Sequence, residues 1–246
     1  MYNPFSLEGK TTLVTGASLG LGASIATEVS KMGANVIITA RNKERLNNVY
    51  QQLSGNNNLQ VIADLCEISD IDALVNSLPV LNGVVLCAGI IKTMPVKNIT
   101  DDAIENVFNT NILSSIRLLS RILKAKKLAK GASVIFISSV STFNVKVGNS
   151  LYSGSKGAVN SFAKAMALEV SKQDMRVNCI QPGFIPTGML VPGAITDEQI
   201  STYVDKHPLG LGRPTDVSYA CVYLLSEASR WITGSILTID GGLTLR

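Results

Sequence analysis

The stretch Thr12-Leu13-Val14-Thr15-Gly16-Ala17-Ser18-Leu19-Gly20-Leu21-Gly22 decides the fold of this 246-residue chain. A short β-branched run, which predicts a strand, leads through a glycine-rich turn into a helical pattern over Gly20–Met32. Glycines here let a strand turn tightly into a helix and let backbone N–H groups approach a diphosphate. Such a turn is weak evidence alone, but its place in the first βαβ unit favours a dinucleotide site over an ordinary turn.

Strand and helix patterns alternate along the rest of the chain. Most strand candidates are continuously apolar, which is typical of parallel strands covered by helices on both faces. The alternation predicts one doubly wound α/β domain over residues 1–246, with a seven-stranded parallel sheet and helices on both faces. The expected strands are Thr12–Thr15, Asn35–Thr39, Leu59–Ala63, Gly83–Cys87, Ser133–Ser138, Arg176–Ile180 and Ile236–Ile239, and the expected helices are Gly20–Met32, Lys43–Leu53, Ile68–Ser77, Asp101–Ala129, Leu151–Lys172 and Thr215–Ser226.

Composition excludes several classes of protein. Charged residues make up 16% and hydrophobic residues 46%, which excludes a disordered chain, and a net charge of +4 gives no reason to expect nucleic acid or a membrane surface. The sequence has no signal-peptide pattern and no apolar run of the ~20 residues that a membrane helix needs, so we expect a cytoplasmic protein. Cys66, Cys87, Cys179 and Cys221 form no C-x-x-C pair, and we expect packed thiols, a surface or rim position for His207, and no metal site.

The second strand candidate ends at Thr39-Ala40-Arg41-Asn42. Proteins that bind NAD place an acidic residue near this point on the ribose 2′-hydroxyl, and Ala40 cannot serve that purpose. The planar guanidinium of Arg41 suits a 2′-phosphate instead. The sequence therefore predicts NADP(H), while a solvated loop cation is the alternative interpretation of Arg41.

Tyr152 and Lys156 lie four residues apart at the start of a predicted helix and therefore share a face of that helix. Such a pair also arises often by chance. Ser139, however, follows the fifth strand candidate, at the sheet edge where ligands of open α/β sheets bind. A phenol can protonate a carbonyl oxygen that receives hydride if a cation lowers the phenol pKa. Lys156 could supply that cation, and Ser139 could hold the carbonyl oxygen.

Asn111, Ser139, Tyr152 and Lys156 match the catalytic tetrad of the short-chain dehydrogenase/reductase family, which the chain resembles over nearly its whole length. The resemblance implies a Rossmann-type fold, a nicotinamide cofactor, and a water held by Asn111 that links Lys156 to solvent. Further matches are Thr15 with the G-x-x-x-G-x-G turn, Cys87-Ala88-Gly89 for N-N-A-G, Pro182–Thr187 for P-G-x-x-x-T, Gly210-x-x-Arg213-Pro214, and Asp240-Gly241-Gly242. By resemblance, the cofactor contacts are Gly16, Ser18, Leu19, Gly20, Leu21, Gly22, Arg41, Asp64, Leu65, Ala88, Gly89, Tyr152, Lys156, Pro182, Gly183, Ile185 and Thr187.

The resemblance implies an NADP(H)-dependent oxidoreductase that transfers hydride between nicotinamide and a small-molecule carbonyl or secondary alcohol. The 3-oxoacyl-(acyl-carrier-protein) reductases look most similar, which makes a carrier-bound 3-oxoacyl thioester one substrate candidate. Their two carrier-docking arginines correspond to Lys130 and Gln173 here. The family also implies a homo-oligomer, dimer or tetramer, formed through the Asp101–Ala129 and Leu151–Lys172 helices, and a substrate lid over about 188–207.

Two other functions stay open at this point. One is a non-catalytic nucleotide-binding or regulatory protein on the same fold, against which the complete tetrad argues. The other is a sugar epimerase or dehydratase, which the chain length disfavours because those enzymes carry an added substrate domain.

Overall fold

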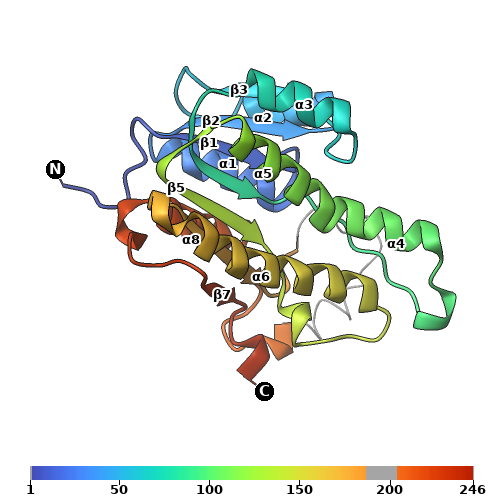
Figure 1. Cartoon of the computed structure of the whole chain (residues 1–246). Helices are drawn as coiled ribbons and strands as arrows, with labels where there is room; N and C mark the ends of the chain where they lie inside the picture. Colours follow the sequence, from blue (N-terminus) through green and yellow to red (C-terminus); the bar gives the residue numbers. More distant parts are fainter. Residues whose placement is uncertain (1, 187–203, 246) are drawn as a thin grey trace.

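The computed structural model describes residues 2–186 and 204–245, and its seven strands form one parallel sheet in the order β3-β2-β1-β4-β5-β6-β7 (Figure 1). The strands are β1 (Thr11–Thr15), β2 (Asn35–Ala40), β3 (Leu59–Ile62), β4 (Leu81–Leu86), β5 (Leu128–Ile137), β6 (Arg176–Pro182) and β7 (Ile236–Ile239). The helices are α1 (Gly20–Lys31), α2 (Lys43–Tyr50), α3 (Ile68–Ser77), α4 (Asp101–Phe108), α5 (Ser114–Lys124), α6 (Ser150–Val170) and α8 (Pro214–Leu225).

The sheet has a hydrophobic core on each face, because successive side chains along a strand point to opposite sides. Helices α3, α5 and α6 cover one face, where their apolar side chains pack against Leu13, Val84 and Phe136. Helices α1, α2 and α8 cover the other face, against Val14 and Val85. The doubly wound α/β fold predicted from the sequence is therefore confirmed.

The expected helix over Asp101–Ala129 is helical without a break from Asp101 to Lys124, but the expectation is wrong in the middle of the helix and at its end. A π turn, η2 (Asn109–Leu113), separates α4 from α5, and α5 ends at Lys124. The chain then reverses through Lys126, whose φ of 53° is left-handed, and enters β5 at Leu128. Neither glycine nor proline marks this reversal, so the apolar periodicity of the helix runs on into the strand without a visible break.

Other expected boundaries differ from the observed ones only at element ends. The largest difference is at β5, which begins at Leu128 rather than Ser133. Gly131, with a φ of 76°, interrupts the apolar run in the sequence, so the sequence did not indicate that the strand is continuous across it. None of the helices in the two described ranges combines the length and the apolar character that a membrane span requires.

The turn between β1 and α1 has no room for side chains at two of its glycines. Gly16 has a φ of 63°, and a Cβ atom there would lie 2.7 Å from the Cα of Ala88. A Cβ atom on Gly22 would lie 2.3 Å from the carbonyl oxygen of Gly16. Both contacts are with backbone, which cannot rotate away as a side chain can. The glycine spacing is therefore a steric requirement of this turn.

Candidate active site

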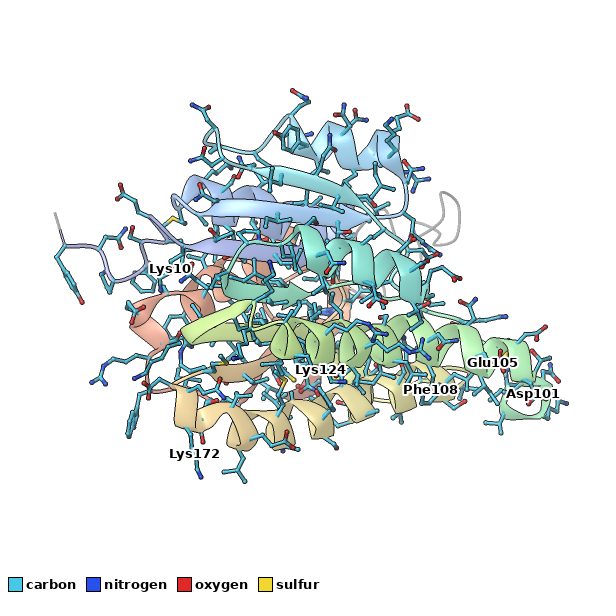
Figure 2. All side chains as sticks on the ribbon, turned by 45° about the horizontal axis from the view of Figure 1, so that its top comes forward. Lys10, Asp101, Glu105, Phe108, Lys124 and Lys172 are labelled. Atoms are coloured by element: carbon cyan, nitrogen blue, oxygen red, sulfur yellow. The ribbon has the colours of Figure 1, made fainter. Side chains whose placement is uncertain are left out.

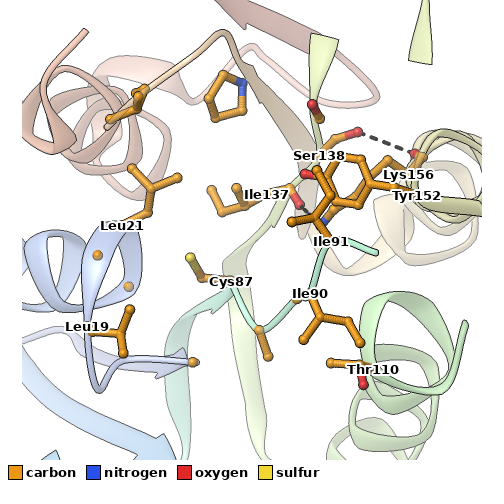
Figure 3. Close-up of a pocket in the computed structure, with 18 of the residues that line it drawn as sticks. Leu19, Leu21, Cys87, Ile90, Ile91, Thr110, Ile137, Ser138, Tyr152 and Lys156 are labelled. Atoms are coloured by element: carbon orange, nitrogen blue, oxygen red, sulfur yellow. Dashed lines mark hydrogen bonds between the residues drawn. The ribbon is translucent and has the colours of Figure 1, made fainter. Parts of the chain in front are cut away.

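The carboxyl ends of the central strands border a cleft of about 560 Å³ (Figure 3). Figure 3 shows Leu19 and Leu21 on one side of it, Tyr152 and Lys156 on the other, and Cys87 between them. A cleft of this size suits a small-molecule ligand. The predicted site residues that line it are Gly16, Ser18, Leu19, Gly20, Leu21, Gly22, Arg41, Asp64, Leu65, Ala88, Gly89, Ser139, Tyr152, Lys156, Pro182, Gly183 and Ile185.

Some predicted features fall elsewhere. Asn111 lies behind the cleft wall rather than in the lining, and it is only 2% exposed. Thr187 lies outside the described residues. Most of the expected lid over about 188–207, up to residue 203, also lies outside the described residues.

The glycine turn offers backbone donors to an anion. Helix α1 begins at Gly20, and among the described residues no side chain caps its N-terminus. The residue at the cap position is Leu19, whose apolar side chain cannot accept a hydrogen bond, and the first turn contains no acidic residue. Unsatisfied N–H groups and the positive end of the helix dipole therefore face the cleft. This arrangement fits the diphosphate of a dinucleotide.

The far end of the cleft, beyond the glycine turn, carries two guanidinium groups. Arg41 is 65% exposed at its side chain, and its Nη1 lies 3.5 Å from Oδ2 of Asp64. Arg45, in the first turn of α2, also lines the cleft. Reading the sequence for a single basic residue after the second strand missed Arg45, although its place in the first turn of the helix that follows this strand was a usable signal. Among the described residues that line the cleft, Asp64 is the one carboxylate, so the two guanidinium groups outnumber it.

Tyr152 and Lys156 lie in the first two turns of α6 and face the cleft together (Figure 3). The Lys156 ammonium donates to the carbonyl of Ile137 at 2.7 Å, and the hydroxyl of Ser138 donates to the carbonyl of Lys156 at 3.3 Å. Both bonds fix the helix against the end of β5. Burial lowers the pKa of Lys156 to about 8.

The phenol of Tyr152 does not have the lowered pKa that the sequence suggested. Burial raises the pKa of Tyr152, and a hydrogen bond with the Ser139 side chain offsets this only in part. The Lys156 ammonium lies 5.9 Å from the centre of the ring, and burial also disfavours its charge. The expectation that Lys156 lowers the pKa of the Tyr152 phenol toward 7 is therefore wrong in this structure.

Ser139 is held at the point where β5 ends. Its backbone is extended, and it stands at the cap position of the short turn η3 (Val140–Thr142). Its Oγ accepts a hydrogen bond from the backbone N–H of Ser141 at 3.2 Å. This bond and the contact with Tyr152 set the position of a hydroxyl that faces the cleft.

Asn111 joins two walls of the site through its amide group. Its Oδ1 accepts from the N–H of Ile90 at 2.7 Å, and its Nδ2 donates to the carbonyl of Ile90 at 3.0 Å. The same Nδ2 donates to Oγ of Ser155 at 2.9 Å. Asn111 thus holds the loop after β4 against α6. Sequence reasoning missed Ser155, although a serine directly before Lys156 on the inner face of a helix was a visible signal.

Other candidate residues have mixed outcomes. Cys179 and Cys221 are buried as expected, whereas Cys66 and Cys87 are half-buried and line the cleft. His207 is 4% exposed and does not line the cleft, so the surface or rim position expected for it is wrong. The loop that carries it packs against the C-terminal turn, which removes it from solvent. Within residues 2–186 and 204–245, no three His, Cys, Asp or Glu side chains gather into a group that could hold a metal ion.

Comparison with known proteins gives a consistent result. A family model described as enoyl-(acyl carrier protein) reductase matches residues 16–244. Versicolorin reductase 1 from Dothistroma septosporum is 33% identical over 258 aligned positions, which cover 97% of each chain. The 3-oxoacyl-(acyl-carrier-protein) reductase of Chlamydia trachomatis is 32% identical over 245 positions, which cover 96% of this chain and 98% of its own.

A crystal structure of a short-chain type dehydrogenase/reductase from Mycobacterium marinum matches with a TM-score of 0.87 at 28% identity, covering 99% of this chain and 98% of that one. The chain belongs to the short-chain dehydrogenase/reductase family. Short-chain dehydrogenases/reductases are oxidoreductases that use NAD or NADP and act on small molecules. The fit of the glycine turn to a diphosphate agrees with such a cofactor.

This short-chain dehydrogenase/reductase departs from the family pattern where Leu86 and Cys87 stand for two asparagines. The departure leaves the loop after β4 tied to β1. The N–H groups of Cys87 and Ala88 both contact Oγ1 of Thr15, at 3.1 and 3.3 Å. The threonine before the glycine turn therefore links the wall of the cleft to the strand that carries the turn.

Proposed function

We propose that the protein is an NADP(H)-dependent oxidoreductase that transfers hydride between the nicotinamide and a carbonyl or secondary alcohol. One observation carries this proposal: the glycine turn and the Ser139, Tyr152 and Lys156 side chains line the same cleft. The bound cofactor supplies or accepts the hydride. The chain's own groups then need only bind the substrate oxygen and move its proton. This complete set also argues against a purely regulatory nucleotide binder.

The proposed roles follow from the pKa directions. Tyr152 is protonated at neutral pH, since burial raises its pKa above the ordinary phenol value, and this proton is the one proposed to pass to the substrate oxygen. Lys156 is charged below about pH 8 and would stabilise the phenolate that remains. The Ser139 hydroxyl, which already contacts Tyr152, would hold the substrate oxygen beside the phenol. Asn111 supports the site from behind and, by family resemblance, holds a water that links Lys156 to solvent.

The cofactor contacts are proposed in three groups. The glycine turn holds the diphosphate through backbone N–H groups, while the loop after β4 and the segment after β6 form the walls around the nicotinamide. Arg41, Asp64 and Leu65 form the adenosine end. The full proposed set is Gly16, Ser18, Leu19, Gly20, Leu21, Gly22, Arg41, Asp64, Leu65, Ala88, Gly89, Tyr152, Lys156, Pro182, Gly183, Ile185 and Thr187.

The proposed preference for NADP(H) rests on Arg41. A charge-assisted hydrogen bond to a 2′-phosphate contributes ~1.5–3 kcal/mol, which corresponds to a roughly ten- to a hundred-fold preference over NAD(H). Dissociation constants for NADPH and NADH in the wild type and in Arg41→Ala test this. Lys43→Ala is the matched control, because Lys43 is an exposed cation two residues away that does not line the cleft. Equal affinities in the wild type, or a preference that survives Arg41→Ala, would contradict the proposal.

The substrate is proposed only as a class. Relatives include a 3-oxoacyl-(acyl-carrier-protein) reductase, but two of the lysines that could receive an acidic carrier already have partners. Lys127 donates to the carbonyl of Leu78, and Lys130 forms a 3.1 Å ion pair with Asp174. NADPH oxidation with a panel of 3-oxoacyl thioesters, keto sugars and quinones tests the reductase activity. Absence of turnover with every carbonyl class would contradict it.

We also propose a homo-oligomer that pairs the α4–α5 and α6 face between subunits. Figure 2 shows Asp101 and Glu105 at one end of this helix pair and Lys124 toward the other. Leu168 is 78% exposed on α6, so this face carries apolar surface as well. Two copies related by a two-fold axis would place the acidic end of one over the basic end of the other. Light scattering after size exclusion tests this, and a monomer at all concentrations would contradict it.

A further inference from the structure

Ser155 occupies a buried position between the catalytic candidates. It lies in α6, its side chain is 0% exposed, and it is not part of the cleft lining. Its hydroxyl donates to the carbonyl of Tyr152 at 2.8 Å and accepts from Nδ2 of Asn111 at 2.9 Å. No other described hydroxyl bonds to both of these residues. Ser155 therefore connects the π turn η2 directly to the first turn of α6.

This connection has a fixed direction. A serine hydroxyl has one proton, and in Ser155 that proton is committed to the Tyr152 carbonyl. Its oxygen can then only accept from Asn111, so the amide must present Nδ2 to Ser155 and Oδ1 to the N–H of Ile90. One continuous set of hydrogen bonds thus runs from the loop after β4 to the backbone of the proton donor.

The two ends of this set form opposite parts of the proposed site. The loop after β4 contributes Ala88 and Gly89 to the cleft wall, and α6 contributes Tyr152 and Lys156. The walls approach closely, because a Cβ atom at Gly89 would lie 3.3 Å from Nζ of Lys156 and from Oδ1 of Asn111. A change in the spacing of these walls would therefore move the phenol relative to a ligand held by the loop.

We infer that Ser155 is a positioning residue for hydride transfer: it sets the distance between the loop after β4 and the proton donor on α6, acting through Asn111. The inference rests on the proposed oxidoreductase function. Ser155 does not line the cleft in which substrate and cofactor would bind, so its loss should reduce the rate of the chemical step and leave binding almost unchanged. A misplacement of about 1 Å can lower a rate by up to a hundred-fold.

The test measures kcat, KM and the NADPH dissociation constant in Ser155→Ala. We expect kcat to fall about tenfold or more, with KM and the dissociation constant within about twofold of the wild type. Ser155→Thr, which keeps a hydroxyl able to bond the carbonyl three residues earlier, should recover most of kcat. If Ser155→Ala fails to fold, Ser155→Cys, with its weaker donor, makes the same comparison against Ser155→Thr.

Two controls separate positioning from general stability. Ser133 is 1% exposed and donates to the carbonyl of Leu224 at 2.7 Å, so Ser133→Ala removes a buried hydroxyl in the middle of β5 that does not line the cleft. Its melting temperature should fall while its kcat stays near that of the wild type. In the second control, Asn111→Ala and Ser155→Ala are combined. If Ser155 acts through Asn111, the double variant should be no slower than Asn111→Ala alone.

Three results would overturn the inference: a wild-type kcat in Ser155→Ala, an equal loss of kcat in Ser133→Ala, or losses that multiply in the double variant. Failure of the proposed function looks different. In that case the wild-type protein itself shows no NADPH-dependent turnover with any carbonyl, while its stability and fold are intact.

Discussion

The glycine turn and the tyrosine centre, on opposite sides of one cleft, are built in different ways. The turn is one continuous stretch, and what it offers a ligand is backbone: N–H groups at the start of α1 and room where Gly16 and Gly22 lack a Cβ. The tyrosine centre gathers Ser139, Tyr152 and Asn111 from three separate parts of the chain, and what it offers is side chains. The turn should therefore tolerate loss of functional groups but not added atoms, and the tyrosine centre should show the reverse.

The largest effect should come from Lys156→Met, which removes the ammonium group and keeps a side chain of similar volume. We expect kcat below about 1% of the wild type, since the variant loses the cation beside the phenol. Stability should rise instead. Burial lowers the pKa of Lys156 from 10.5 to about 8, so the charged form that dominates at pH 7 is the disfavoured one in the folded protein.

The measurement for Lys156→Met is the melting temperature at pH 7 together with kcat. The gain is at most ~3 kcal/mol, part of which the lost bond to the Ile137 carbonyl removes. Lys164→Met is the control, because Lys164 is an exposed lysine of the same helix. A melting temperature below that of the wild type would show that burial does not disfavour the Lys156 charge.

The turn should be most sensitive to Gly16→Ala, which adds one carbon where the Cα of Ala88 is 2.7 Å away. We expect the NADPH dissociation constant to rise about tenfold or more, because the backbone must shift away from the position that binds the diphosphate. The value of kcat at saturating NADPH should change less. Gly55→Ala controls for the positive φ alone, since Gly55 has a φ of 86° and nothing within 4 Å of the added atom. An unchanged dissociation constant in Gly16→Ala would contradict the claim that this turn has no room for a side chain at position 16.

A smaller effect should appear in the pH dependence of carbonyl reduction. The charged form of Lys156 is the protonated one, so it is present below a pKa of about 8 and lost above it. Tyr152, whose pKa burial raises, stays protonated through the same range. We expect kcat/KM to be level below pH 7 and to fall by about tenfold per unit well above pH 8. A level profile through pH 9.5 would show that the lysine charge plays no part.

The contrast also explains what the sequence could predict. The turn was recognisable because the positive φ of Gly16 and the contact of Gly22 with the Gly16 carbonyl are requirements within the turn itself, and the seven strands followed from apolar runs and their alternation with helices. The π turn around Asn111 could not be predicted, because it depends on the Ile90 backbone and Ser155, which are distant in sequence.

The sequence also could not predict how deeply individual side chains are buried. The order of residues places Tyr152 near Lys156, but it does not reveal how far both are removed from water. That removal reverses the expected direction of the Tyr152 pKa. It also places the lone histidine, His207, inside the protein instead of at its surface. Both errors come from tertiary packing, which local spacing does not encode.

The most direct test of this division of roles between the glycine turn and the tyrosine centre is an NADPH titration of Tyr152→Phe alongside its turnover. Loss of the phenol oxygen removes the proposed proton donor, so kcat should fall by at least about a hundred-fold. Because backbone on the opposite side of the cleft is proposed to hold the diphosphate, the NADPH dissociation constant should stay within about twofold of the wild type. A variant that keeps more than about a tenth of wild-type kcat, or one that loses NADPH binding along with turnover, would contradict the account.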